Sequence, residues 1–145
     1  MNYFFYNNDA NALRGHRRTH VLIKEEIAVS GGPPSFGEQL RQLSTGDTLL
    51  MYENRVGVVA VGEVEESWDG KSHRKPIYYV LGQSYLDPAR EYRIKVKWFI
   101  DLTNSPISFR NVKQRLGYQP RGTVRKIVKR RPEVESMVAE CLSSR

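Results

Sequence analysis

The sequence predicts an α+β domain built on a small, strongly curved β-sheet or barrel, and three observations support this fold class. Two apolar segments, 48–52 and 55–64, are separated only by the turn residues Glu53 and Asn54, which is the pattern of a β-hairpin. Segment 92–100 alternates apolar with mainly basic side chains, as a half-buried strand with a basic outer face does. The other helix and strand patterns follow in mixed order, without βαβ regularity.

The hairpin is predicted to be the centre of this fold. Its second strand is apolar at both odd and even positions, and a strand that is apolar on both faces is covered on both faces. Gly57 and Gly62 within this strand predict bends or a close approach of another backbone, as at the corners of a small barrel.

Short elements precede the hairpin. An aromatic strand over 2–6 comes first, and Asp9 is placed to cap a brief helix over 10–13. A basic loop over 14–20 then leads to a short apolar run over 21–23.

The segment just before the hairpin is predicted to be a loop followed by a helix. The Gly-Gly and Pro-Pro pairs within 28–34 indicate an irregular loop. Ser35 and Glu38 fit a capping box, and apolar residues between 36 and 43 fall on one helical face, which we expect to pack on the sheet.

The chain after the hairpin completes the predicted domain. The elements are, in order, a loop over 65–75, a strand over 77–81, the strand over 92–100, a helix over 106–116, a strand over 121–128 and a closing helix that begins at Pro132, with Val134, Met137, Val138, Cys141 and Leu142 facing inward. The total is about five to seven strands and three or four short helices.

Length and composition exclude several classes of protein. A chain of 145 residues with ordinary charge predicts one globular domain spanning residues 1–145. No apolar run approaches the roughly 18 residues that cross a bilayer, and no signal-peptide pattern is seen, so we expect a cytoplasmic protein. One cysteine and three scattered histidines predict neither a disulfide nor a metal site, and no cofactor motif is present.

The charge is strongly basic, and it is unevenly distributed. A net charge of +7 points to an acidic partner, most often nucleic acid. Segment 102–132 contains nine cations and no Asp or Glu. A solvated surface is the ordinary explanation of a charge run, but the length of this acid-free segment favours contacts with backbone phosphates. The predicted phosphate-binding residues are Arg14, His16, Arg17, Arg18, Lys71, Arg74, Lys75, Arg125 and Lys126.

The ordered set of these elements resembles the EVE-type domains of the PUA-like superfamily, to which the YTH and ASCH domains are related. The resemblance covers almost the whole chain, although the first strand and segment 14–34, which shape the family's pocket, depart from the usual sequence. It rests on the Met-Asn-Tyr start, Gly46-Asp47 before a strand that ends in Tyr52, the valine-rich strand up to Val64, the strand with Trp98 followed by Pro106-Ile-Ser, and Arg121-Gly-Thr-Val before the closing helix.

This resemblance implies a PUA-like curved barrel flanked by short helices, with a pocket for a modified base turned out of its helix. Such modules bind and do not catalyse, and they occur alone or attached to nucleases and restriction machinery. We therefore expect a reader of modified cytosine or N6-methyladenine, in DNA rather than RNA, that acts alone or with a nuclease or motor subunit.

A base pocket needs flat aromatic surfaces and a few groups that hydrogen-bond the edge of the base. A core position is the alternative for Tyr52 and Trp98, and a helix-capping turn is the alternative for the two asparagines. The predicted pocket residues are the ring-stacking Tyr6, Tyr52, Trp68 and Trp98 and the polar Asn7, Asn8, Ser30, Arg121 and Thr123.

Three other functions remain open at this point. An RNA-binding PUA-like protein is one, and a structural interaction module is another. The third is a small ASCH-like hydrolase, for which Tyr52-Glu53 together with Lys24-Glu25 is the only candidate grouping.

Overall fold

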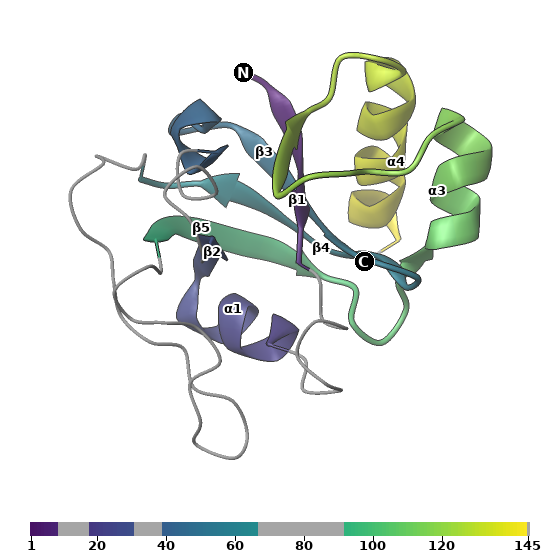
Figure 1. Ribbon diagram of the computed structural model, residues 1–145. Helices are drawn as coiled ribbons and strands as arrows, with labels where there is room; N and C mark the ends of the chain where they lie inside the picture. Colours follow the sequence, from purple (N-terminus) through teal and green to yellow (C-terminus); the bar gives the residue numbers. More distant parts are fainter. Residues whose placement is uncertain (9–17, 31–38, 67–91, 145) are drawn as a thin grey trace.

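A curled sheet with helices on both faces forms the framework (Figure 1). The computed structural model describes residues 1–8, 18–30, 39–66 and 92–144. In chain order the elements are β1 (Tyr3–Asn7), α1 (Thr19–Glu25), β2 (Ile27–Ser30), the 3-10 helix η2 (Gln39–Gln42), β3 (Thr48–Glu53), β4 (Gly57–Val64), β5 (Tyr92–Asp101), β6 (Ile107–Ser108), α3 (Phe109–Leu116), β7 (Val124–Lys126) and α4 (Arg131–Ser143). The predicted α+β class, with a curved sheet and short flanking helices, is confirmed.

The strands join in the order β2-β5-β4-β3-β1-β7, with the short β6 paired to β4. β1 and β3 run parallel, and the other pairings are antiparallel. The predicted hairpin is therefore β3–β4, and it lies in the middle of the sheet. Its turn includes Arg55 at φ 66°, so the second strand begins at Gly57, two residues later than predicted.

Each face of the sheet has its own hydrophobic core, as the doubly apolar second strand predicts. On one face, here called the α1 face, Phe4, Leu49 and Val59 pack with Leu22 of α1 and with Leu40. On the opposite face, the α3–α4 face, the strand residues pack against both later helices (Figure 1). The residues of this second core include Phe5, Leu50, Val61, Val112, Leu116, Val134 and Met137.

The Tyr6 hydroxyl joins β1 to β2, two strands that lie far apart in the order of the sheet. β2 ends the sheet, so its outer edge has no strand partner among the described residues. The hydroxyl of Tyr6, on β1, donates a hydrogen bond to the carbonyl oxygen of Val29 at 2.7 Å and accepts one from the Val29 amide at 3.0 Å. Because Tyr6 and Val29 are fully buried, this one side chain satisfies two edge groups that water does not reach.

A close approach of β4 and β5 occurs where Gly62 faces Trp98. A Cβ atom on Gly62 would lie 2.7 Å from Cε3 of Trp98 and 2.8 Å from the carbonyl oxygen of Lys97. Only glycine fits beneath this indole without displacing it. The close approach predicted at Gly62 is confirmed.

Two predictions before the hairpin differ from the structure where its residues are described. Residues 28–30 are not part of a loop, because Ile27–Ser30 forms strand β2 and pairs with β5. The helix expected up to 43 is described only from Gln39, where η2 is a single 3-10 turn. Leu40 and Leu43 are nevertheless buried against the sheet, as predicted.

Three predictions after the hairpin need correction. The helix expected from 106 begins at Phe109, because Ile107 and Ser108 pair with β4 and the Ser108 side chain caps the helix by accepting a hydrogen bond from the Asn111 amide. The strand expected over 121–128 is shorter. In α4, Leu142 is 50% exposed and does not face inward. The predicted elements over 10–13 and 77–81 lie outside the described residues.

We expect Tyr6→Phe to destabilise the protein by about 1–3 kcal/mol, because it leaves the amide and carbonyl of Val29 buried without their partner. Chemical denaturation measures the change. Tyr3→Phe is the matched control, since the Tyr3 hydroxyl makes no hydrogen bond with described residues and the substitution keeps the ring that packs against the α3–α4 core and contacts Arg131. Equal losses in the two variants would contradict the role given to the Tyr6 hydroxyl.

Candidate nucleic-acid interface

The predicted aromatic pocket is not built as expected, because its tyrosines lie on opposite faces of the sheet. Tyr6 belongs to the core of the α1 face. Tyr52 belongs to the core of the α3–α4 face, where it is 2% exposed. Its ring meets the Phe5 ring edge-on, with the ring centroids 6.3 Å apart. Burial raises the pKa of the Tyr52 hydroxyl. Tyr6 and Tyr52 therefore do not form one pocket.

Tyr6 and Trp98 do come together, on the α1 face. Their rings stack with centroids 6.3 Å apart and an interplanar angle of 28°. The Nε1–H of Trp98 donates to the carbonyl oxygen of Ile27 at 3.0 Å, so both aromatic side chains bind the backbone of β2. With exposures of 0% and 9%, the two rings form a buried wall on this face.

A buried polar network connects the residue after β1 with α1 and β3. The Asn8 side-chain amide donates to the Thr19 hydroxyl at 2.9 Å and contacts the sulfur of Met51 at 3.6 Å. The Thr19 hydroxyl in turn donates to a carboxylate oxygen of Glu53. Arg18 completes the network by donating from Nε to Oδ1 of Asn8 at 2.7 Å. Asn8, Thr19 and Glu53 are each at most 1% exposed.

This network changes the roles expected of two residues. The amide of Asn8 already has partners for both its nitrogen and its oxygen, so it holds α1 to the sheet. Arg18, predicted to bind phosphate, uses its Nε on Asn8. Thr19 was not predicted to matter, and no local signal marks it, because its partners are 11 and 34 residues away in the sequence.

The other polar pocket candidates have mixed placements. Asn7 pairs with Tyr52 in the register of β1 and β3 and so lies on the α3–α4 face, where its buried Oδ1 has no hydrogen-bond partner among the described residues. Ser30 ends β2 and is 3% exposed. The carbonyl of Thr123 accepts a hydrogen bond from the Asn7 amide at 2.8 Å, and its own amide is bound by the Gln39 side chain.

Two adjacent basic residues of β7 point to opposite faces. Arg125 pairs with Phe5 and lies on the α3–α4 face, whereas Lys126 pairs with Phe4 and lies on the α1 face. Arg121, predicted to line the base pocket, borders a surface hollow together with Arg125. It therefore lies with the cations of the acid-free segment.

Seven predicted site residues lie outside the described residues. They are Trp68 of the base pocket and Arg14, His16, Arg17, Lys71, Arg74 and Lys75 of the phosphate-binding set.

The residues proposed for a hydrolase do not come together as one group. Alternation along β3 puts Tyr52 on the α3–α4 face and turns Glu53 to Thr19 on the opposite face. Lys24 and Glu25 are exposed in the last turn of α1. The described residues also contain no group of three metal-ligating side chains.

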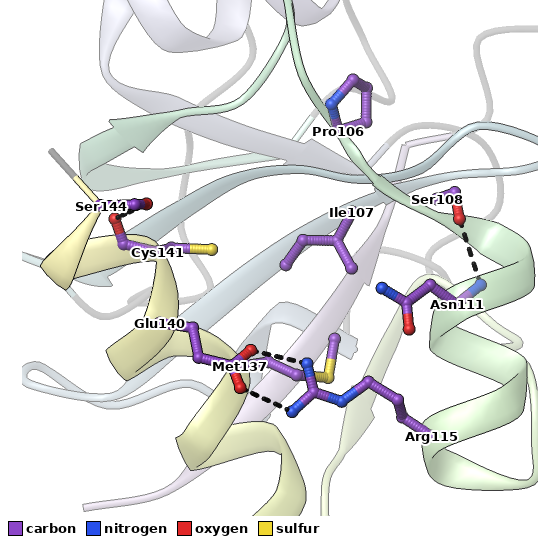
Figure 2. Close-up of a pocket in the computed structure, with 9 residues that line it drawn as sticks. All are labelled: Pro106, Ile107, Ser108, Asn111, Arg115, Met137, Glu140, Cys141 and Ser144. Atoms are coloured by element: carbon purple, nitrogen blue, oxygen red, sulfur yellow. Dashed lines mark hydrogen bonds and ion pairs between the residues drawn. The ribbon is translucent and has the colours of Figure 1, made fainter.

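A second hollow, of about 450 Å³, lies between α3, α4 and β6 (Figure 2). Arg115 reaches across it to Glu140 at 2.7 Å and also bonds Glu133 at 2.6 Å. The hydrogen bond from Arg115 holds the pKa of Glu140 below its ordinary value. Burial raises the pKa of the Cys141 thiol on the far wall, so the thiol is not an activated nucleophile. This hollow offers no unpaired cation to a phosphate.

The structure resembles solved structures whose sequences are very different. The Mmi1 YTH domain matches with a TM-score of 0.64 at 8% identity, covering all of both chains. A structure of that domain in complex with RNA matches with a TM-score of 0.63 at 8% identity, over 99% of this chain and 79% of the other. A hypothetical protein from Leishmania major matches with a TM-score of 0.60 at 14% identity, over 99% and 96%.

At these identities the likeness establishes the fold alone, which is YTH-like. No protein-family model matches the sequence, and the comparison with curated proteins found no match. In the described part of the chain, no helix is long and apolar enough to span a membrane.

We expect Thr19→Val to destabilise the protein by about 1–3 kcal/mol, because it leaves the amide of Asn8 and a carboxylate oxygen of Glu53 buried without the hydroxyl between them. Thermal or urea denaturation measures the change. Thr45→Val, at an exposed position, is the control and should shift stability by no more than about 0.5 kcal/mol. A Thr19 variant as stable as the control would show that the network contributes little.

Proposed function

We propose that this chain is a non-catalytic module that binds nucleic acid and recognises a modified base. The observation that carries the proposal is the match over nearly the whole chain to the YTH domain of Mmi1, which has also been solved in complex with RNA. The resemblance of the sequence to EVE-type domains points to the same kind of ligand.

The distribution of charge supports a nucleic-acid ligand. The acid-free segment 102–132 forms α3, the connection to β7 and β7 itself, and it ends at the start of α4. Its cations therefore gather along one end of the sheet and the neighbouring helix. Contacts of this kind bind phosphates whatever the base sequence, so they supply affinity while a base pocket supplies selectivity.

The α1 face is the proposed side for base recognition. Tyr6 and Trp98 form its aromatic wall, and Ser30 lies at the end of β2 close to Val29, which Tyr6 binds. Since Tyr6 and Trp98 are buried and hydrogen-bonded, they support the site, and Trp68 remains the predicted residue that stacks on the base.

Two polymers are candidates for the ligand. From the sequence we propose DNA that carries modified cytosine or N6-methyladenine, with a nuclease or motor as partner. RNA is the second candidate, and the RNA complexes of the Mmi1 YTH domain favour it.

The test is fluorescence-anisotropy binding to matched short duplexes and single strands of DNA and RNA. They carry cytosine, 5-methylcytosine, 5-hydroxymethylcytosine, adenine or N6-methyladenine. We expect one modified strand to bind about 10–200-fold more tightly than its unmodified match, the range that a small apolar group contributes in a pocket. Trp68→Ala should remove this preference, whereas the control Leu142→Ala, at an exposed position of α4, should keep it.

Equal binding to all modified and unmodified strands would refute base recognition and leave a general nucleic-acid binder. Absence of binding to every strand would refute the proposed function as a whole. A preference that Trp68→Ala preserves would move the base site away from that residue.

A further inference from the structure

A hollow of about 440 Å³ lies where the end of α3, its connection to β7, and β7 meet. It is lined by Lys113, Gly117, Tyr118, Gln119, Arg121 and Arg125. All three cations are exposed. Neither Lys113 nor Tyr118 was predicted as a site residue, although both belong to the acid-free segment that drew attention to nucleic acid.

The charge of this hollow is not neutralised by neighbouring carboxylates. In the described part of the chain, the ion pairs use Lys95, Arg115 and Arg131, and none involves a cation of the hollow. The acidic residues of α4 that are nearest along the chain, Glu133 and Glu135, are bound by Arg115 and Arg131. The hollow thus keeps a charge of about +3, which attracts an anion.

One of the cations is held in position. The guanidinium carbon of Arg125 lies 5.4 Å from the centroid of the Tyr118 ring, a cation–π contact. The Tyr118 hydroxyl donates to the carbonyl oxygen of Lys129 at 2.9 Å, which fixes the ring on the loop that follows β7. Arg125 therefore loses less side-chain entropy when it binds a phosphate than a free arginine would.

The helix end at this hollow does not cancel its charge. Gly117 caps the C-terminus of α3, and its amide binds the carbonyl of Lys113 at 2.8 Å. A helix C-terminus carries about half a negative charge, which is small beside three full positive charges.

We propose that this hollow binds the phosphodiester backbone of a nucleic-acid strand, with each of its three cations contacting a phosphate, and that this nucleic-acid strand crosses the β7 end of the sheet between the two faces. The inference rests on the proposed function and adds the location of the backbone. Arg125 faces the α3–α4 side and Lys126 the α1 side, so β7 presents cations to both sides of the sheet end. A nucleic-acid strand that is held here reaches the α1 face, where the base site is proposed, by passing over β7.

The test compares two triple variants that remove the same charge. The first, the hollow variant, removes every cation of the hollow by combining Lys113→Gln, Arg121→Gln and Arg125→Gln. Lys24→Gln with Lys95→Gln and Lys97→Gln is the control, at exposed positions of α1 and β5. Binding of modified and unmodified single strands is measured between about 0.05 and 0.3 M salt, and thermal melting confirms that both variants fold.

The hollow variant should bind all strands more weakly by the same factor. The loss of three phosphate contacts makes the dependence of log affinity on log salt concentration shallower, by about 2 in the size of the slope. Near 0.1 M salt this corresponds to a loss of affinity of about 100-fold. Any preference for a modified base should persist. The control variant should change the salt slope and the affinity by only a small fraction of these amounts, because its cations lie away from the hollow.

Three outcomes would overturn the inference. If the hollow variant binds like the wild type, or if the control loses as much, the hollow is not the phosphate site, although the proposed function stands. If wild-type protein binds no strand but binds inorganic phosphate or phosphatidylserine vesicles through these cations, the site serves a free anion or a lipid headgroup. That last result would also refute the proposed function.

Discussion

The double hydrogen bond between the Tyr6 hydroxyl and Val29 closes the curl of the sheet by joining β1 to β2. In the strand order, β1 and β2 are separated by β3, β4 and β5, so this bond joins the far sides of a sheet that has rolled toward itself. A hydroxyl can make both bonds because it donates and accepts hydrogen bonds at once. The unpaired edge of a strand offers it both an amide and a carbonyl. Trp98 reinforces the closure by stacking on Tyr6 and binding Ile27.

The curl also determines which residues can act together. In a β-strand, the side chains of adjacent residues point to opposite faces of the sheet. Two adjacent residues that look like one functional group in the sequence are therefore separated by the sheet. Tyr52 and Glu53 are divided in this way, and so are Arg125 and Lys126. Conversely, Asn8, Thr19 and Glu53 meet in one network although they come from the residue after β1, from α1 and from β3.

The sequence predicts the parts of the fold whose signal is local. The β3–β4 hairpin, the alternation of β5 and the apolar stripe of α4 are each set by the periodicity of the chain itself. β2 was missed because the Gly-Gly and Pro-Pro pairs beside it dominate the local pattern, whereas its stability comes from β5, more than 60 residues later. Periodicity also cannot show that Arg18 would bind Asn8, since that contact needs the closed sheet.

The likeness to the Mmi1 YTH domain at 8% identity is a likeness of fold and not of side chains. Two such different sequences share the fold through backbone geometry, so most side chains are free to differ. In this chain the side chains of Tyr6, Asn8 and Thr19 are buried, and their hydrogen bonds hold separate segments of the fold together. Using one of them for a base would break a buried hydrogen bond, at a cost of about 1–3 kcal/mol, similar to what a small base modification contributes. For the proposed function, selectivity is therefore best sought among side chains outside this network, and affinity among exposed cations, which can contact phosphate without breaking a buried hydrogen bond.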